Sequence, residues 1–329
     1  MAVGPGTPSV HVRHGGDQWD PRGPCGHGGR AQHAVRWGAR LAECCRGCRG
    51  GGAAVSARLR GIAQETVDIV AAGGYTTPGG RHVALADAVS AARAGTSLHG
   101  PEPVGVPARA QVATTVEVTG ESSLEAAHRL HTTGGGPAAV LNFASARNPG
   151  GGFLNGAQAQ EEALCRSSAL YACLLEQRGF YDHHRAHLDP FYSDRVIHAP
   201  AVPVFRDDRG RLLEVPYVAG FLTSPAPNAG VVRRTAPERA AALPRALAVR
   251  AERVLETAAA HGHRRLVLGA WGCGVFRNDP AQVAAAFHAL LRAPGRFAGY
   301  FDHVVFGVLD RSGDTATRAA FERAFASGG

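Results

Sequence analysis

Residues 138–162 read AAVLNFASARNPGGGFLNGAQAQEE, an apolar run that leads into a glycine triplet and ends on Gln-Glu-Glu. The apolar run Ala138–Phe143 is typical of a strand buried in a parallel sheet, and Pro149 marks the turn beyond it. The glycines at 150–152 therefore follow the carboxyl end of a strand, where open α/β sheets bind their ligands. Because residues without a Cβ let backbone N–H groups approach an anion closely, this loop is predicted to hold a phosphate-like group.

The residues from Gln160 to Leu175 are compatible with one uninterrupted helix, since apolar residues recur and no helix breaker intervenes. Glu161 and Glu162 would lie in its first turn. Neighbouring helical residues point about 100° apart, so the two carboxylates are expected to have different roles rather than to share one proton. Burial beside a second carboxylate and a bound anion raises a carboxyl pKa more than a helix terminus lowers it, so a general acid is plausible here at neutral pH.

A second glycine loop, GCGVF at residues 272–276, follows the short apolar strand 266–268. It leads into Asp279 and Pro280, which suit the first positions of a helix, and this order of strand, loop and helix is typical of anion sites. Arg277 fills the third glycine position of a dinucleotide fingerprint, so the loop is not of that kind. A plain structural turn is the alternative. Cys273 has no histidine motif beside it and is not expected to be a nucleophile.

Strands and helices alternate through the second half of the chain, which predicts a three-layer α/β/α fold with a mixed sheet and an N-terminal helical extension. The expected strands are 76–85 as an extended pair, 114–118, 138–143, 195–205, 212–222, 266–268 and 304–308. The expected helices begin near residue 57 and also cover 86–94, 122 onward with a capping box, 160–175, 237–260, 280–291 and 315–326.

The positive charge is concentrated at the start of the chain. The net charge is +8 without any lysine, but residues 1–60 hold nine arginines against three acidic residues, so the other 269 residues hold only +2. No direct binding to nucleic acid is therefore expected. Residues 1–54 lack any period and are predicted to be a disordered leader or a mis-assigned gene start. We expect one catalytic domain at 55–329, with a helical accessory part at 55–135 and the core at 136–329.

Cysteines and histidines predict neither a disulfide framework nor a metal site. Seven cysteines are an odd and sparse set, and Cys44, Cys45 and Cys48 lack the second pair of a zinc site. The histidines at 183–187 are interpreted as part of a solvated loop before Asp189, although their spacing would suit a metal on a helix. No apolar run reaches the roughly 18 residues of a membrane span, and no secretory signal is evident, so we expect a cytoplasmic protein without membrane contact, metal or cofactor.

The glycine triplet, the seven residues after it and the Gln-Glu-Glu triplet resemble the signature of poly(ADP-ribose) glycohydrolases. Neighbouring residues resemble the short bacterial type of this family. Three further parts agree with it: residues 62–66 with Gly74 and Tyr75, residues 223–228, and residues 269–276. The resemblance spans residue 57 to the C-terminus and is not seen in the residues before it.

The resemblance implies a macrodomain-like fold and hydrolysis of the ribose–ribose O-glycosidic bond of poly(ADP-ribose), with release of ADP-ribose by an exo-acting enzyme. In the family's scheme Glu162 protonates the departing 2′-oxygen and then activates water, while Glu161 holds ribose hydroxyls. One carboxylate acting in both steps departs from the two-carboxylate scheme of most glycosidases. Further substrate-binding residues are expected to be Ser145, Ala146, Gly150, Gly151, Gly152, Asn155, Gln160, Pro225, Ala226, Gly272, Cys273, Gly274, Val275 and Phe276.

Some of these residues have specific expected roles. The loops around Gly151 and Gly274 would clamp the diphosphate, and Phe276 would position the ribose at the scissile bond. Asn155 would touch the ribose, and Pro225 with Ala226 would line the adenosine pocket, although both segments could also serve only as turns.

Two other functions share the same pocket. A non-catalytic ADP-ribose reader is the first alternative, but a reader does not need a carboxylic acid at position 162. A macrodomain hydrolase that removes single ADP-ribose groups from proteins or nucleic acid is the second. The expected substrate is therefore poly(ADP-ribose) or an ADP-ribosylated protein, and the enzyme is expected to act as a monomer that reverses ADP-ribosylation, as in a DNA damage response.

Overall fold

The computed structural model describes residues 49–310 and 315–326, all within one compact unit. The strands are β1 (Gly74–Thr76), β2 (His82–Ala84), β3 (Ser97–His99), β4 (Thr115–Thr119), β5 (Ala139–Phe143), β6 (Val196–Arg206), β7 (Leu212–Ser224), β8 (Arg265–Gly269) and β9 (His303–Gly307). The helices are α1 (Arg49–Ala72), α2 (Ala86–Gly95), α3 (Ser123–Thr132), η1 (Phe153–Asn155), α4 (Gln160–Ser167), α5 (Leu170–Leu175), α6 (Arg178–Ala186), α7 (Ala229–Thr235), η2 (Pro237–Ala242), α8 (Leu243–Ala260), α9 (Pro280–Leu291) and α10 (Ala316–Phe325).

The central sheet has seven strands in the order β3-β6-β7-β5-β8-β9-β4. The five strands from β7 to β4 run parallel to one another, whereas β6 and β3 are antiparallel to their neighbours. The predicted mixed sheet is confirmed. Both edge strands, β3 and β4, come from residues 55–135, so the expected accessory part supplies strands to the same sheet as the expected core.

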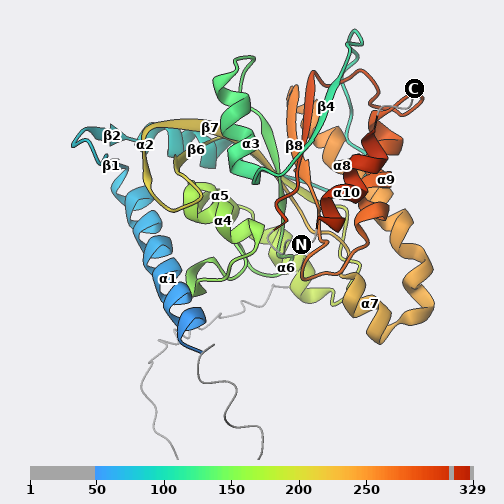
Figure 1. Ribbon diagram of the computed structural model, residues 1–329, viewed down its shortest axis with the longest axis horizontal. Coiled ribbons are helices and arrows are strands. Elements are labelled where there is room, and N and C mark those ends of the chain that lie inside the picture. The colour runs from blue at the N-terminus through green and yellow to red at the C-terminus, as the bar shows by residue number, and fades with distance from the viewer. Residues whose placement is uncertain (1–48, 311–314, 327–329) are drawn as a thin grey trace, which may run out of the picture. The chain divides into compact units, whose positions relative to one another are not determined.

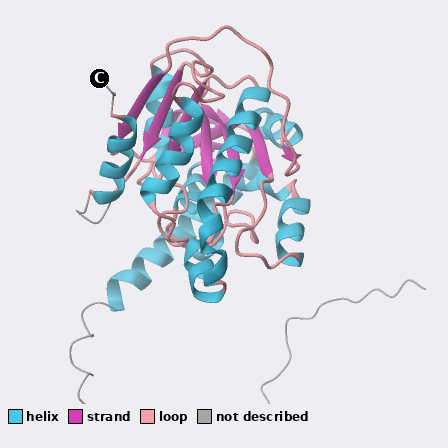
Figure 2. Cartoon of the chain, turned by 90° about the vertical axis from the view of Figure 1, so that its right-hand side faces the viewer, coloured by secondary structure: helices cyan, strands magenta, loops and turns pink. Residues whose placement is uncertain are grey.

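Helices cover both faces of this sheet (Figures 1 and 2). Side chains alternate between the faces along each strand, as β geometry requires. On β5, Val140 packs in a core with α1 to α5, whereas Leu141 packs in a second core with α8, α9 and α10. The continuous apolar run that marked this strand in the sequence therefore reflects burial on both faces. The predicted three-layer α/β/α arrangement is confirmed.

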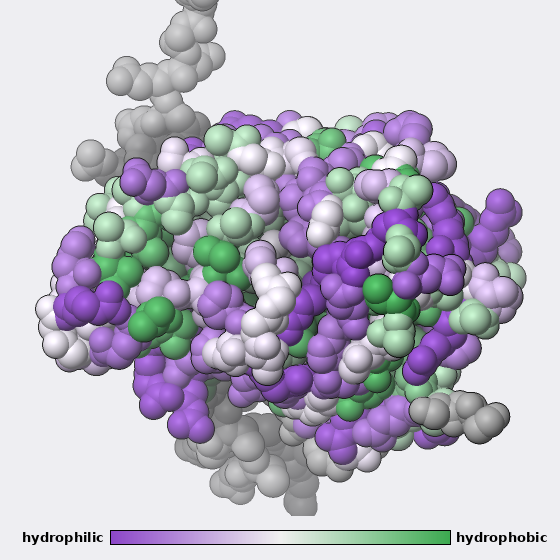
Figure 3. Space-filling model, turned by 90° about the horizontal axis from the view of Figure 1, so that it is seen from above, coloured by the Kyte–Doolittle hydropathy of each residue, from purple (hydrophilic) through white to green (hydrophobic). Residues whose placement is uncertain are grey.

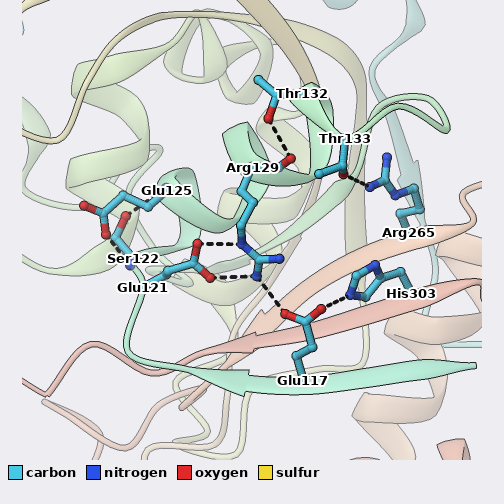
Figure 4. A network of polar contacts seen from close by, with 9 residues as sticks. All are labelled: Glu117, Glu121, Ser122, Glu125, Arg129, Thr132, Thr133, Arg265 and His303. Atoms are coloured by element: carbon cyan, nitrogen blue, oxygen red, sulfur yellow. Dashed lines mark hydrogen bonds and ion pairs between the residues drawn. The ribbon is translucent and has the colours of Figure 1, made fainter.

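A polar network holds the corner between β4 and α3 (Figure 4). Ser122 and Glu125 form the predicted capping box: each side chain accepts a hydrogen bond from the other residue's backbone N–H. Arg129 lies between two carboxylates and donates to Glu121 at 2.7 Å and to Glu117 at 2.9 Å. This network fixes the chain where it leaves the carboxyl end of β4.

The amino ends of the parallel strands lie at the opposite edge of the sheet, which is uppermost in Figure 1. Figure 3 looks onto this edge and shows a surface on which hydrophobic residues are scattered among hydrophilic ones. Glycines 134–136, which precede β5, have φ between +81° and +93° and turn the chain from α3 into the sheet.

The predicted helix 160–175 is wrong in one respect, because it is broken between α4 and α5. Ser168 has an extended backbone (φ −147°, ψ 174°) and forms an isolated antiparallel bridge with Val204 on β6. Its hydroxyl donates to the Leu164 carbonyl at 2.7 Å and accepts from the Leu170 N–H at 3.2 Å. The break follows from pairing with a distant strand, which local sequence does not indicate.

The prediction of a solvated loop at residues 183–187 is also wrong. Most of this run lies in α6, and His184 is buried, with Nδ1 2.8 Å from the Phe180 carbonyl and Nε2 2.8 Å from the Ser193 hydroxyl. The helix ends at Ala186, so Asp189 and the following proline mark its end and not a longer loop.

Helix α1 begins at Arg49, eight residues before the predicted start. Glycines 50–52 lie in its first turn, where helix N–H groups have no intrahelical partner in any case. Residues 1–48, with the cysteines at 44, 45 and 48, lie outside the described residues. None of the helices at 49–310 and 315–326 is both long and apolar enough to cross a membrane.

Candidate active site

Two loops that leave neighbouring strands form the candidate site. The first, residues 144–159, joins β5 to α4, and the second, residues 270–279, joins β8 to α9. Since β5 and β8 pair in parallel, both loops leave the same edge of the sheet. The ends of the two strands touch: a Cβ on Gly269 would lie 3.1 Å from the Phe143 ring. The prediction that both glycine loops follow strand carboxyl ends is confirmed.

The first loop needs glycine at two positions where it turns toward α4. Gly150 and Gly151 have φ of +67° and +58°, in the left-handed region that favours glycine. A Cβ on Gly151 would overlap Oε1 of Glu162, and a Cβ on Gly150 would meet the Tyr171 ring at 3.0 Å. The glycines therefore bring the loop backbone directly against the first turn of α4.

Glu161 is enclosed by hydrogen-bond donors and is 2% exposed. Its Oε1 accepts from Asn142 Nδ2 at 3.2 Å, and its Oε2 accepts from the backbone N–H of Ser145 at 2.6 Å. Burial raises the pKa of Glu161 to about 8, although these hydrogen bonds act to lower it. The raised carboxyl pKa that the sequence predicted for this pair is thus found at Glu161.

Glu162 lies beside it with a different set of contacts. Its Oε1 accepts a hydrogen bond of 2.8 Å from the backbone N–H of Gly152. Its Oε2 is buried and has no hydrogen-bond partner among the described residues. Because an unpartnered buried carboxylate oxygen is costly, it marks a position for a ligand or water. Glu161 is thus hydrogen-bonded at both carboxylate oxygens and Glu162 at one, which agrees with different roles for the two residues.

Gln160 fastens the start of α4 to β5. Its Oε1 accepts from the Phe143 N–H at 2.9 Å, and its Nε2 donates to the Leu141 carbonyl at 2.8 Å and to the Ser123 hydroxyl at 3.0 Å. These bonds use the side-chain amide to position the glutamate pair relative to the sheet.

Hydrogen bonds from two buried side chains anchor the second loop to the end of β7 and the segment after it. The Trp271 indole N–H donates to the Ser224 carbonyl at 3.0 Å, and Asn278 Nδ2 donates to the Pro227 carbonyl at 2.8 Å. Gly272 has a φ of +70°, and a Cβ there would lie 2.5 Å from Asn278 Nδ2. Gly274 is exposed, with open space where a Cβ would lie. This loop therefore presents its backbone at Gly274 outward over a rigid base.

Burial, and next the nearby Asp279 carboxylate, raise the pKa of Cys273 to about 12. A thiolate, and not a thiol, is the nucleophile in cysteine catalysis, so this raised pKa argues against a catalytic role for Cys273.

Phe276 ends the second loop against a residue that the sequence did not single out. Its ring centroid lies 5.8 Å from that of Tyr192, in the segment between α6 and β6. Tyr192 has a φ of +58°, which is rare for an aromatic residue. Its N–H donates to the Asp189 carbonyl at 3.0 Å, so Tyr192 ends a local turn over residues 189–192 that the sequence analysis did not connect with the site.

A cavity of about 530 Å³ opens beside both loops. Part of its lining comes from residues in or next to the two glycine loops: Phe143, Gln160, Ala270, Cys273 and Gly274. Its walls come from segments that the sequence did not connect with the site: residues 55–62 of α1, 122–124 before and in α3, the 207–210 turn, 307–310 after β9, and Thr317. The segments after β4 and β9 could have been found from the rule that ligands bind at strand carboxyl ends.

Of the predicted site residues, Gln160, Cys273 and Gly274 line this cavity, whereas Glu161, Glu162 and the glycines at 150–152 do not. Pro225 and Ala226 are buried beneath the second loop, where the Pro225 carbonyl accepts from Arg250 Nη1 at 2.8 Å, and neither lines the cavity. Ala146 is buried, whereas Asn155 and Val275 are exposed. The Asn155 carbonyl accepts a hydrogen bond of 3.4 Å from the Ser56 hydroxyl on α1.

No group of three or more His, Cys, Asp or Glu side chains in residues 49–310 and 315–326 is arranged to hold a metal ion. In α6 and just after it, the His183 and His187 rings stack at 4.2 Å, and His183 Nε2 lies 3.0 Å from Arg195 Nη1.

Comparison with family models matches residues 63–207 to the family described as microbial-type PARG, catalytic domain, where PARG is poly(ADP-ribose) glycohydrolase. No curated protein matches the chain. Among solved structures, the poly(ADP-ribose) glycohydrolase from Thermomonospora curvata is 53% identical, with a TM-score of 0.78, and the match covers 82% of this chain and 100% of that one.

Two further solved structures contain ligands. A complex of the Thermomonospora curvata enzyme with the inhibitor ADP-HPD is 52% identical over 82% of this chain and 100% of that one, with a TM-score of 0.75. The poly(ADP-ribose) glycohydrolase from Deinococcus radiodurans in complex with ADP-ribose is 44% identical over 72% of this chain and 96% of that one, with a TM-score of 0.67.

Proposed function

The chain belongs to the microbial-type poly(ADP-ribose) glycohydrolases, and on this basis we propose that it hydrolyses the ribose–ribose O-glycosidic bond of poly(ADP-ribose) and releases ADP-ribose. The observation in this chain that carries the proposal is the free oxygen of Glu162. Its Oε2 is buried and has no hydrogen-bond partner among the described residues, and Oε1 of the same carboxylate is held by the first glycine loop.

Glu162 acts in both steps of the reaction. In the first, its carboxylic acid gives a proton to the 2′-oxygen of the leaving unit while the bond from C1″ to that oxygen breaks. The ribose becomes oxocarbenium-like, and the leaving polymer carries a complete 2′-hydroxyl. In the second, the Glu162 carboxylate takes a proton from water as the water oxygen bonds to C1″, which yields ADP-ribose and restores the acid.

The surrounding groups fix this carboxylate. The N–H of Gly152 holds Oε1 at 2.8 Å, so Oε2 is the oxygen that exchanges the proton. Glu161, held by Asn142 and Ser145, lies one residue away and accepts ribose hydroxyls when they displace or share these donors. A carboxyl group with both oxygens occupied is suited to positioning and not to proton transfer.

The cavity accommodates the adenosine end of the ADP-ribose unit, and the loop backbones hold its diphosphate. The open position at Gly274 and the left-handed glycines at 150 and 151 support this placement, because backbone N–H groups reach a phosphate only where no Cβ intervenes. Phe276 then packs against the ribose at the scissile bond.

We further propose a macrodomain-like, exo-acting enzyme that works as a monomer in the cytoplasm and reverses ADP-ribosylation, including that made in response to DNA damage. The order of the sheet and the site at its carboxyl edge support the macrodomain likeness. The odd and sparse cysteines support a reducing compartment.

The test is incubation of the purified protein with poly(ADP-ribose) of defined length and measurement of released ADP-ribose. A second substrate, a protein that carries single ADP-ribose groups, separates the two hydrolytic activities. Release from the polymer is expected. Tight binding of ADP-ribose without any release would instead show a reader, and release only from the singly modified protein would show a mono-ADP-ribosyl hydrolase.

A further inference from the structure

Arginines surround the site on the side away from the cavity. None of them lines the cavity, and each lies on a segment that leaves or meets the carboxyl edge of the sheet. They are Arg147 in the first loop, Arg185 in α6, Arg195 before β6, Arg233 in α7 and Arg277 after the second loop. We call these five residues the arginine rim.

Hydrogen bonds connect the rim to both glycine loops. Arg185 Nη1 donates to the Arg147 carbonyl at 2.5 Å, three residues before Gly150. Arg233 Nη1 donates to the Arg277 carbonyl at 2.8 Å, directly after Phe276. One pair of arginines thus lies at the start of the first loop, and the other pair lies at the end of the second.

Both glycine loops have residues at the cavity and residues at the rim. The first loop borders the cavity at both ends, at Phe143 and at residues 158–160, and reaches the rim at Arg147. The second reaches the cavity at Cys273 and Gly274 and the rim at Arg277. The Gly152 N–H that holds Glu162 lies between the two ends of the first loop. An ADP-ribose unit that extends from the cavity to Glu162 therefore has its scissile bond directed toward the rim.

Two strained residues lie at this same place. In the described residues, three non-glycine residues have positive φ: Tyr192 (+58°), Ala201 (+43°) and Arg277 (+55°). Arg277 follows Phe276 in the chain, and the Tyr192 ring contacts Phe276 from the other side. Left-handed conformations at non-glycine residues are strained and cluster at ligand sites, which agrees with a function for this part of the surface.

The rim is short of negative charge. Arg185 is paired with Asp182 at 2.5 Å, with about half of its side chain exposed. Among the described residues, the polar contact of the Arg195 guanidinium is with an imidazole, that of His183. Arg147 and Arg277 are exposed, and no carboxylate of the described residues lies within ion-pair distance of either. Nearby Asp189 and Asp194 are already paired with Arg239 and Arg250. Outside residues 1–60 the chain is almost neutral, so this local excess is a specific feature.

We propose that the arginine rim binds the diphosphate of the next ADP-ribose unit, the one on the leaving side of the scissile bond. This inference rests on the proposed function, because it takes the polymer as substrate. A diphosphate is anionic at neutral pH, and arginine binds phosphate oxygens through paired N–H groups. The rim thus gives polymer an advantage over substrates that have no second diphosphate.

Arg147 and Arg277 are the best positions for a test, because within the described residues their guanidinium groups make no hydrogen bond or ion pair that the fold would lose. The double variant Arg147→Gln with Arg277→Gln removes two charges and keeps a long polar side chain at each position. The matched control is Arg323→Gln, an exposed arginine on α10, away from both loops.

Two substrates separate the rim from the main site. The first is poly(ADP-ribose), and the second is ADP-ribose with a nitrophenoxy group at C1″, which keeps the scissile carbon but lacks a second diphosphate. The double variant is expected to lower kcat/KM for polymer about tenfold, mainly through KM, and to change that for the nitrophenyl substrate less than about twofold. Added salt should lower kcat/KM for polymer in both proteins. Between about 50 and 200 mM salt, we expect this decrease to be smaller for the double variant than for the wild type.

Three results would overturn the proposal. Equal losses of kcat/KM on both substrates would show that the two arginines act in the main site or stabilise the fold. No loss on either substrate would show that the rim does not bind the polymer. Inhibition of polymer hydrolysis by single-stranded DNA as strong as that by a non-hydrolysable polymer would show a general polyanion surface. If the wild type cleaves neither substrate, the proposed function fails first, which is a distinct outcome.

Discussion

The backbone N–H of Gly152 donates a hydrogen bond of 2.8 Å to Oε1 of Glu162, while Oε2 of the same carboxylate is buried without a partner among the described residues. The bond fixes the orientation of the carboxyl plane from the loop side. Only one oxygen of this carboxylate is therefore left free of a hydrogen bond among the described residues. If Glu162 is the acid, as we propose, the first loop is what orients it.

Glu162→Gln is expected to abolish turnover and to keep the site intact. The Gln carbonyl can accept the Gly152 bond, so its amide nitrogen replaces Oε2, which leaves the shape unchanged but removes the acid and base. We expect ADP-ribose release to fall at least about 10³-fold, with the ADP-ribose Kd changed less than about tenfold. Calorimetry and product release measure the two effects. Glu176→Gln, which affects only a surface pair with Arg93, should leave both unchanged. Substantial turnover by the Glu162 variant would exclude this residue as the acid.

Gly274→Val is expected to weaken ADP-ribose binding without loss of folding. Gly274 has no positive φ, and open space surrounds the position that a Cβ would take, so valine fits the fold but covers the backbone that meets the diphosphate. Wild-type protein at about 100 times its Kd of ADP-ribose should gain about 2.7 kcal/mol of stability, and the variant should lose most of this gain. Adenosine, which lacks the diphosphate, should protect both proteins little. An unchanged thermal shift in a folded variant would remove the second loop from the site.

Gly151→Val is expected to behave differently from Gly274→Val. At Gly151 the φ of +58° is unfavourable for a branched residue, and the side chain would overlap Glu162 Oε1. The variant should therefore lose stability by about 1–3 kcal/mol as well as ligand protection. Circular dichroism melting without ligand separates the two variants, and equal melting temperatures would contradict the geometry of the first loop.

The central strands and the positions of both glycine loops could be predicted from the sequence because their signals are local. An apolar run such as 138–143 followed by glycine indicates a buried strand and the turn at its end. The break at Ser168 could not be predicted, since it depends on a bridge to Val204. The contact of Tyr192 with Phe276 was missed for a similar reason, because the two residues are distant in sequence.

The position of the glutamate pair was predictable, whereas the cavity was not. Glu161 and Glu162 are adjacent in a distinctive triplet at the start of a helix, so the sequence placed both in its first turn, where the structure has them. The cavity wall combines α1, the 207–210 turn and the segment after β9, which are distant in sequence. Pro225 and Ala226 had the composition of a lining turn, but they are buried under the second loop, so their proposed contact with adenosine is not supported by the cavity.

Glu161 should make stability depend on pH. Burial raises its pKa to about 8 in the native state, against about 4.3 in an unfolded chain. Because the native state binds this proton more tightly than the unfolded state, Glu161 adds to the free energy of unfolding at low pH. This contribution is lost as the pH rises through 8. In Glu161→Gln this titration is absent. The melting temperature of the variant minus that of the wild type should therefore rise by at least about 3 °C between pH 5 and pH 8.5. A constant difference would contradict the raised pKa.

Two N-terminal deletions that end before and within α1 are expected to have different effects. Residues 1–48 lack a periodic apolar pattern, so their deletion is expected to leave the melting temperature and activity unchanged. Deletion of residues 1–62 is expected to be different, because α1 contributes residues 55–62 to the cavity wall and Ser56 donates to the Asn155 carbonyl in the first loop. Its loss should raise KM for the polymer and lower the melting temperature. Equal activity of the two truncated proteins would show that α1 is not part of the site, and a large loss from the shorter deletion would place residues before Arg49 within the working domain.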